Sequence, residues 1–436
     1  MMITVTEYAE LQSYDLTAIS GIKKRYVSQG TLDWLIENYQ NWISEDSDAE
    51  PILTDFRKNS FRLGAYVGYI QSPYNDEQIQ IYPKIDIGDG SITESRLILK
   101  KMLSVVYDLN AKELSEAELD HQELPLHEWI ISRFLKELED LLHIGLKRDY
   151  ELVQDEQCFI KGRLLACKQM RRGPGQEAIF DLEYDEFLFN GIENQLIKTA
   201  LNYVLELTRN EQSLLMAFDF SVLLESISES MNPIDDLNKW REDRLLSHYI
   251  KIKPWCEIIL SSISPSFQEG SHKGISLLFS MPHLYEKYVA KLLKIKPGLR
   301  LHIQTSQRTL IQHQPIKERD QRWFRLEPDL AIKDGCEFKV ILDTKWKLIN
   351  QLQTSSRDKY GINQADLYQM FAYGHKYLDG RGKLVLIYPM HQKFNKILPV
   401  FKFSDELILY AIPFDLKKGK LVEKNFIEEN FNSVFI

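Results

Sequence analysis

Hydrophobic and polar positions in the first ninety residues alternate between a helical and a strand-like spacing. Apolar residues three and four apart predict a helix over Thr31–Ser44. Two apolar runs on either side of a turn-rich segment, Phe61–Ile70 and Gln78–Tyr82, predict strands. We therefore expect a small mixed, β-containing module over residues 1–90.

The middle of the chain, residues 91–263, has mainly the helical spacing. The predicted helices are Leu97–Leu109, Leu126–Leu142 and Phe187–Leu207. One basic segment, Phe159–Ala166, interrupts the pattern and predicts an extended stretch. The middle region is therefore predicted to be mainly helical.

Residues 264–436 alternate between helices and strands, which is the order of a mixed sheet flanked by helices. Helices are predicted over Pro282–Leu293 and Asn363–Leu378. The predicted strands are Arg300–Gln304, Leu326–Lys333, Glu337–Trp346, Lys383–Tyr388 and Leu407–Ile412. The predicted fold class of the whole chain is α+β and multidomain, with a C-terminal α/β domain after the two earlier parts.

The composition is that of a folded protein kept in a reducing compartment. The chain has 436 residues, of which 44% are hydrophobic and 27% charged. Its four cysteines lie far apart without metal-ligand spacing. Glu7 and Glu10 stand where a secretory signal would be apolar, and no run approaches the ~18 apolar residues of a membrane helix. We expect a cytoplasmic protein without a membrane segment.

The charge balance opposes strong unspecific binding to DNA. The 54 basic and 63 acidic residues give a net charge of −9, whereas such binding depends on neutralising phosphates. Basic residues are nevertheless concentrated locally between Arg308 and Arg325. This segment contains Arg308, Lys317, Arg319, Arg322 and Arg325 against Glu318 and Asp320. It is either a local DNA contact or a solvated loop.

Two acids and a lysine are expected on neighbouring strands of the C-terminal domain. Asp329 enters one apolar strand, and Asp343 and Lys345 end the next. Because side chains alternate along a strand, Asp343 and Lys345 share one face. A two-residue hairpin at Asp334-Gly335 would place Val340 opposite Asp329, so convergence of the acids requires a twisted or longer turn. The alternative is a surface ion pair between Asp343 and Lys345.

These residue types suit a magnesium-dependent hydrolysis of phosphodiesters. Mg²⁺ prefers hard oxygen ligands and keeps several waters. Asp329, Asp343 and the carbonyl of Thr344 are the candidate ligands. Lys345 would position the attacking water or stabilise the transition state.

Two helices carry further candidates. Gln369 and Tyr373 are four residues apart on one predicted helix face with Asp366 one turn earlier, while the buried stripe is expected to be Leu367, Met370, Phe371, Gly374 and Leu378. Gln369 and Tyr373 would hold the DNA backbone or orient Lys345, or else face solvent. Glu286 on the preceding helix is a candidate third acid for the metal, or an exposed glutamate paired with Lys287 or Lys291.

The order of these motifs resembles the PD-(D/E)xK nuclease superfamily in its form with a QxxxY helix. The motifs are Glu286, Pro328-Asp329, Asp343-Thr344-Lys345 and Gln369-x-x-x-Tyr373. More closely, the chain resembles the McrC subunit family of McrBC modification-dependent restriction systems. The segments that carry this closer resemblance are 101–107, 161–164, 190–198, 342–347 and 366–370.

The resemblance implies an endonuclease with Mg²⁺ as cofactor, catalytic residues Asp329, Asp343, Lys345, Glu286, Gln369 and Tyr373, and a metal held by Asp329, Asp343 and Glu286. It also implies an McrB-like AAA+ GTPase ring as partner and double-stranded, modified DNA as substrate, in antiviral defence. The chain would stimulate the GTPase and supply the cut. Dimerisation through the nuclease domain is also expected. The sequence agrees in one respect, because it contains no GxxxxGK[ST] phosphate loop of its own.

The residues before about 260 are expected to dock on and activate the ring, because they contain no catalytic set. Lys161 and Arg163 are the candidate docking residues, and a solvated loop is the alternative for their segment. Two other functions remain open at this stage. One is a catalytically silent adaptor or activator of an NTPase ring. The other is a stand-alone repair nuclease.

Overall fold

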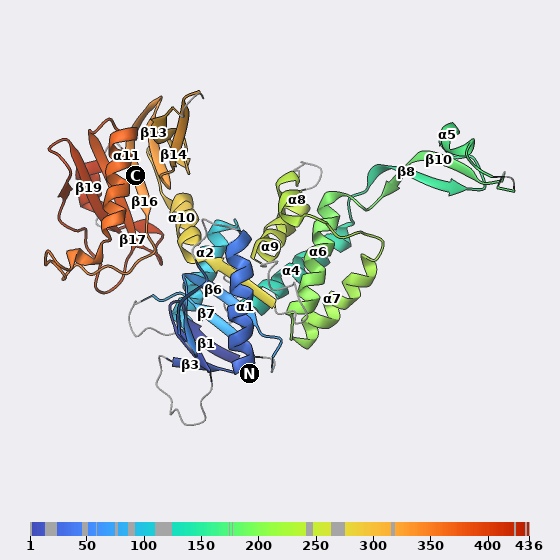
Figure 1. Cartoon of the computed structure of the whole chain (residues 1–436), viewed down its shortest axis with the longest axis horizontal. Coiled ribbons are helices and arrows are strands. Elements are labelled where there is room, and N and C mark those ends of the chain that lie inside the picture. Colours follow the sequence, from blue (N-terminus) through green and yellow to red (C-terminus); the bar gives the residue numbers. More distant parts are fainter. Residues whose placement is uncertain are drawn as a thin grey trace. The chain divides into compact units, whose positions relative to one another are not determined.

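The chain folds into two compact units with mixed α and β structure (Figure 1). Residues 1–111 and 278–436 form one unit, and residues 112–277 form the other. The predicted α+β class is therefore confirmed. The computed structural model describes residues 2–13, 24–45, 51–57, 59–74, 77–85, 92–109, 124–173, 175–176, 178–240, 247–262, 275–314, 319–422, 424–431 and 434–435.

The N-terminal part of the chain forms two helices and two small sheets, one of which is completed by β11 from later in the chain. One sheet has the strand order β1-β7-β6-β11 and the other β3-β2-β5-β4. The strands are β1 (Met2–Thr6), β2 (Glu10–Ser13), β3 (Lys24–Val27), β4 (Leu53–Arg57), β5 (Ser60–Leu63), β6 (Tyr66–Gln71), β7 (Gln78–Tyr82) and β11 (Ile275–Ser280). The helices are α1 (Gln29–Glu45) and α2 (Ile92–Val106).

The predicted strand over Phe61–Ile70 is two strands that belong to different sheets. The chain breaks at Gly64, whose amide donates to the carbonyl of Ile52 at 2.7 Å. A Cβ at Gly64 would lie 2.1 Å from the carbonyl oxygen of Pro51. The close approach of the two backbones therefore requires glycine there.

A seven-stranded sheet forms the centre of the C-terminal part of this unit. Its order is β12-β15-β16-β17-β19-β18, with β20 paired to β19. Strands β15 and β16 are antiparallel, whereas β16, β17 and β19 are parallel neighbours. The strands are β12 (Leu299–Ile303), β15 (Leu330–Asp334), β16 (Glu337–Thr344), β17 (Gly382–Pro389), β18 (Phe401–Lys402), β19 (Leu407–Asp415) and β20 (Lys420–Leu421).

Helices cover both faces of this sheet. Helix α11 (Gln364–Tyr377) packs Met370 and Tyr373 into a core with Leu409 and Ala411 of β19. Helix α10 (Met281–Leu292) places Tyr285 against Phe414, with ring centroids 6.3 Å apart. Since odd and even positions of a strand face opposite ways, the two helices lie on opposite faces. The remaining helices are η3 (Lys359–Gly361) and α12 (Lys424–Phe431).

A separate antiparallel pair, β13 (Arg308–His313) and β14 (Gln321–Leu326), lies beside α11 (Figure 1). These strands occupy most of the basic segment for which a solvated loop was the alternative, and that alternative is wrong for them. Lys317 and Glu318 lie outside the described residues. The pair is called the ribbon below.

The second unit combines helices with a long hairpin. Strands β8 (Asp149–Gln157) and β10 (Phe180–Leu188) pair over nine residues each, and they extend away from the helices of this unit (Figure 1). Short β9 (Arg163–Leu164) pairs with β10. The helices are α4 (Leu126–Ile144), α5 (Ala166–Gln169), α6 (Ile192–Leu207), α7 (Glu211–Leu223), α8 (Pro233–Lys239) and α9 (Tyr249–Ser262).

The predicted helix over Phe187–Leu207 begins only at Ile192. Phe187 belongs to β10, where it is paired with Tyr150 of β8 and their rings lie 4.8 Å apart. Cross-strand pairing therefore overrides the local helical spacing. The predicted division at residues 90 and 264 falls on residues outside those described, and it stays a prediction. No helix in the described part of the chain is long and apolar enough to cross a membrane.

Candidate active site

The turn between β15 and β16 decides which residue lies opposite Asp329. Asp334 pairs with Glu337, so the turn is made by Gly335 and Cys336 rather than by Asp334 and Gly335. A bulge after Ile332 then shifts the register by one more residue, so that Leu330 pairs with Leu342. Extending this register by one position places Asp343 beside Asp329. The displaced turn and the bulge thus bring Asp329 and Asp343 together, as the proposed site requires.

Asp343 and Lys345 form an ion pair in a buried position. Lys345 Nζ lies 2.6 Å from Asp343 Oδ2, and the Asp343 side chain has 0% exposure. The alternative of a surface ion pair is therefore wrong. Burial raises the pKa of Asp343, although Lys345 opposes the rise and Asp366 and Glu286 add to it. Burial lowers the pKa of the Lys345 ammonium group. The pKa is nevertheless raised overall, because the negative charges of Asp343, Asp329 and Asp366 have the larger effect.

Asp329 is held by the end of β16. Its Oδ2 accepts hydrogen bonds from Thr344 N at 2.7 Å and from Thr344 Oγ1 at 2.6 Å. Burial, Asp343 and Glu286 raise the pKa of Asp329 to about 7, against the hydrogen bonds from Thr344. Three acids therefore share one electrostatic environment, which a cation would stabilise.

Helix α11 supports Lys345 through a chain of hydrogen bonds. Lys345 Nζ donates to Gln369 Oε1 at 3.0 Å, and Gln369 Nε2 donates to the hydroxyl of Tyr373 at 2.8 Å. That hydroxyl donates to the carbonyl of Glu327 at 3.0 Å. Gln369 therefore contacts the lysine directly, and its role in orienting Lys345 stays a prediction.

The buried face of α11 differs from the predicted one. Tyr373 is 2% exposed, and Asp366 is also buried, whereas Phe371 is 46% exposed. The expectation that Gln369, Tyr373 and Asp366 form a polar face apart from the core is wrong. Their polar groups are paired inside the protein: Asp366 accepts from Lys347 at 2.9 Å, and Tyr373 bridges Gln369 and Glu327. A buried polar face is stable when its groups are paired in this way.

Glu286 lies on α10 in a buried position, with 9% exposure. Its Oε2 is 3.6 Å from His283 Nδ1, while Lys291 pairs with Asp108. The alternative of an exposed glutamate paired with Lys287 or Lys291 is therefore wrong. Its charge raises the pKa values of both Asp329 and Asp343, so the predicted third acid belongs to the same cluster.

The cluster suits a divalent cation. Asp343 Oδ1 and Glu286 Oε1 are buried, and neither has a hydrogen-bond partner among the described residues. Buried carboxylate oxygens normally have such partners. In the described part of the chain, no group of three His, Cys, Asp or Glu side chains could hold a metal ion by itself. Mg²⁺ is commonly held by one or two carboxylates together with waters and substrate phosphates.

Lys161 and Arg163 lie in the second unit at the far part of the β8–β10 hairpin, and neither belongs to the carboxylate cluster. Lys161 Nζ lies 3.9 Å from the centre of the Tyr184 ring, and Arg163 pairs with Glu183 at 3.7 Å. Between them, a Cβ at Gly162 would lie 2.5 Å from the carbonyl oxygen of Glu183. Of the predicted extended stretch, Arg163–Leu164 is a strand paired with β10, whereas residues 159–162 are exposed loop as in the alternative.

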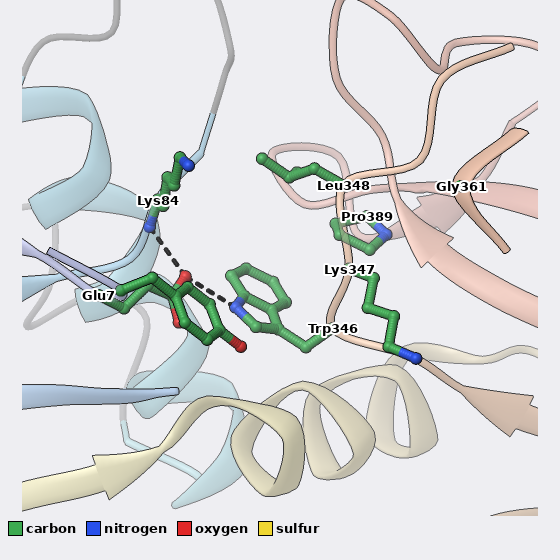
Figure 2. Close-up of a pocket in the computed structure, with 8 residues that line it drawn as sticks. Glu7, Lys84, Trp346, Lys347, Leu348, Gly361 and Pro389 are labelled. Carbon is green, nitrogen blue, oxygen red and sulfur yellow. Dashed lines mark hydrogen bonds between the residues drawn. The ribbon is translucent and has the colours of Figure 1, made fainter. Parts of the chain in front are cut away.

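Sequence reasoning missed one residue that touches this region. Glu7 is 1% exposed, and its Oε1 accepts hydrogen bonds from Trp346 Nε1 at 2.8 Å and from Lys84 N at 2.9 Å (Figure 2). The three residues lie at a cavity of about 320 Å³ whose other walls include Leu348 and Pro389. The short strand β1 gave no signal that Glu7 would meet a residue 339 positions away.

The fold and the buried carboxylate–lysine cluster define a protein with a candidate cation-dependent site at the end of a mixed sheet. The model of the family described as McrBC 5-methylcytosine restriction system component matches residues 61–389. The chain therefore belongs to this family, and the resemblance seen in the motifs is confirmed. No curated protein matched the sequence.

Two solved structures are similar to this chain, and the first of them shares its fold. One is a chain of the refined half-complex from the tetradecameric assembly of Thermococcus gammatolerans McrB AAA+ hexamers with bound McrC. It is 19% identical, with a TM-score of 0.61, and 99% of each chain is covered. Another is a chain of the Thermococcus gammatolerans McrBC complex, 20% identical, with a TM-score of 0.46 and coverage of 67% of this chain and 87% of that one.

Proposed function

We propose that this chain is the DNA-cutting, McrC-type subunit of a GTP-driven restriction complex. Its C-terminal α/β domain would be a Mg²⁺-dependent endonuclease of the PD-(D/E)xK class. The observation that carries the proposal is the fully buried Asp343, which lies beside Lys345 and Asp329 and whose Oδ1 has no hydrogen-bond partner among the residues that the structure describes. A buried carboxylate oxygen without a partner costs stability, and its place in a cluster of charged groups with shifted pKa values supports a functional site.

Each residue of the cluster has a role in this proposal. Asp329, Asp343 and Glu286 would share Mg²⁺ with waters and the substrate phosphate, because no three such side chains among the described residues form a metal site on their own. When bound, Mg²⁺ supplies charge stabilisation at the phosphate and lowers the pKa of water. Lys345, kept protonated by the surrounding carboxylates, stabilises the negative charge that develops on the phosphate. Gln369 and Tyr373 position Lys345 through their hydrogen bonds.

The proposed partner is an McrB-like AAA+ GTPase ring, and the β8–β10 hairpin is the proposed docking part. The family to which the chain belongs and the half-complex whose fold it shares support this partner. The hairpin segment also exposes more large apolar side chains than a free surface normally would. They are Tyr150, Leu152, Phe159, Ile160, Leu164, Met170 and Phe187.

Replacement of Lys345 tests the nuclease assignment. Lys345→Ala should reduce DNA cleavage by the complex on the order of 10³-fold, roughly 4 kcal/mol of barrier, because the transition state loses a fixed positive charge. EDTA should abolish cleavage by the unaltered complex. The matched control is Lys339→Ala, which should cut normally, because Lys339 is an exposed lysine on β16, the strand that precedes Lys345, and pairs with Glu337.

Three results would each contradict a part of the proposal. Normal cleavage by Lys345→Ala would remove the lysine from the reaction. Cleavage that is absent from the unaltered complex at every Mg²⁺ concentration would favour a silent activator of the ring. Cleavage by the chain without the ring protein would favour a stand-alone nuclease.

A further inference from the structure

The ribbon is unlike the other strands of its unit because both of its faces are exposed. In β13, all residues except Thr309 are exposed, and in β14 only the two end residues are partly covered. Phe324 is 65% exposed and Trp323 is 39% exposed. Phe324 also has a positive φ of 56°, which bulky side chains rarely adopt. Trp323 is covered in part by the ring of His313, whose centroid lies 4.3 Å away, whereas neither burial nor backbone preference explains Phe324.

The ribbon is basic in a chain that is acidic overall. Its two strands contain Arg308, Arg322 and Arg325 and no acidic residue, a formal charge of +3 with histidine neutral. The flanking Arg319, Asp320 and Glu327 reduce this charge only to +2. Among the described residues, no acidic side chain forms an ion pair with any of these three strand arginines, and all three are exposed.

The arginines lie on both faces of the ribbon. Arg325 pairs with Thr309 across the strands, and Arg322 pairs with Gln312. Because 309 and 312 are an odd number of residues apart on β13, these two pairs point to opposite faces. Arg308 lies on the same face as Arg322. A negatively charged ligand that contacts the arginines on both faces must surround the ribbon. A ligand that lies against one face could not reach them all.

The base of the ribbon is fixed to the candidate active site. The Tyr377 hydroxyl donates to the carbonyl of Leu326 at 2.6 Å, and Arg308 N lies 3.3 Å from the same hydroxyl. Tyr377 is on α11, two turns after Gln369. Strand β14 ends at Leu326, three residues before Asp329. The arginines are therefore held at a defined position relative to the carboxylate cluster.

We propose that the ribbon enters a groove of duplex DNA and holds the duplex at the cutting site, with Arg308, Arg322 and Arg325 on the phosphates. The proposal rests on the proposed nuclease function. The major groove admits a two-stranded β-ribbon, and its walls carry phosphates on both sides. Exposed arginines on opposite faces match that arrangement of charge. The acidic remainder of the chain explains why contact is confined to this element.

The salt dependence of DNA binding tests this proposal. The full chain is titrated with a labelled duplex in EDTA, without cleavage, from about 50 to 200 mM salt. The variant R308A/R322A/R325A should lower the slope of log K against log[salt] by about 2 to 3, since each lost phosphate contact removes about 0.9. The variant R308K/R322K/R325K should keep the slope. An unchanged slope in the alanine variant would overturn the proposal.

Controls separate this proposal from the nuclease assignment. Arg381→Ala removes an exposed arginine that precedes β17, at the opposite end of the sheet from Asp343, and it should bind like the unaltered chain. If Arg381→Ala lowered the slope as much as the ribbon variant does, the specific role of the ribbon would be overturned. Equal affinity of the unaltered chain for single-stranded and duplex DNA would overturn it too. Asp343→Asn tests the nuclease assignment separately, through cleavage by the complex with Mg²⁺ present. If Asp343→Asn still cuts but the ribbon variant loses binding, the nuclease assignment fails and the ribbon proposal stands.

Discussion

Asp329 lies where a carboxylate is difficult to keep ionised. Burial and the neighbouring Asp343 and Glu286 raise its pKa from 3.8 to about 7. The folded protein therefore binds this proton more tightly than the unfolded chain does, and its stability falls as the pH rises from about 4 to 7. Above about pH 7, where Asp329 is ionised in the folded protein as well, its burial lowers the stability of the fold by the full amount.

Asp329→Asn should therefore stabilise the metal-free protein at pH 8. The asparagine oxygen can still accept from Thr344, while the charge repulsion is lost. We expect Tm in EDTA to rise by at least about 2 °C at pH 8, the response to roughly 1 kcal/mol, and the gain to shrink towards pH 5. Asp334→Asn, at the exposed end of the same strand, is the control. A lower Tm for Asp329→Asn at pH 8 would contradict the described electrostatics.

At the scale of the elements, the hydrophobic periodicity of the sequence predicted where the site's helices begin and end. It did not predict which residues lie opposite one another on neighbouring strands. Helix α11 begins and ends within one residue of the predicted Asn363–Leu378, because Asn363 caps its first turn and its apolar positions are helical. The pairing of Asp329 with Asp343 could not be predicted, because a bulge and a one-residue shift of the turn leave no signal in hydrophobicity. The buried face of α11 was misjudged because Tyr373 and Asp366 are buried through hydrogen bonds rather than through apolar character.

The β8–β10 hairpin is the element on which activation of the ring can be tested. The variant K161A/R163A should reduce stimulation of the partner's GTPase by on the order of tenfold, about 1.4 kcal/mol, because two exposed charges leave the docking element. Cleavage should fall in parallel, while the fold of the chain is retained. Lys239→Ala, an exposed lysine on α8 of the same unit, should stimulate normally. Stimulation that is unchanged in K161A/R163A would remove these two residues from the interface.

At the scale of the whole molecule, residues far apart in the sequence meet beside the proposed cutting site. Glu7 lies in the turn directly after β1, and it accepts a hydrogen bond from Trp346, the residue after Lys345. The ring of Trp346 also lies 5.3 Å from Tyr285, the neighbour of Glu286. The N-terminal sheet is therefore part of the unit that contains the site, and the full chain rather than an isolated C-terminal domain is the protein to test.

The most direct test of the central claim measures two activities on the same sample. The complex of the ring protein with the Asp343→Asn chain is compared with the unaltered complex for DNA cleavage and for GTP hydrolysis. We predict that cleavage falls on the order of 10³-fold, while GTP hydrolysis stays at the stimulated rate, because Asp343 belongs to the nuclease site alone. Cleavage at the unaltered rate would contradict the claim that this chain cuts the DNA.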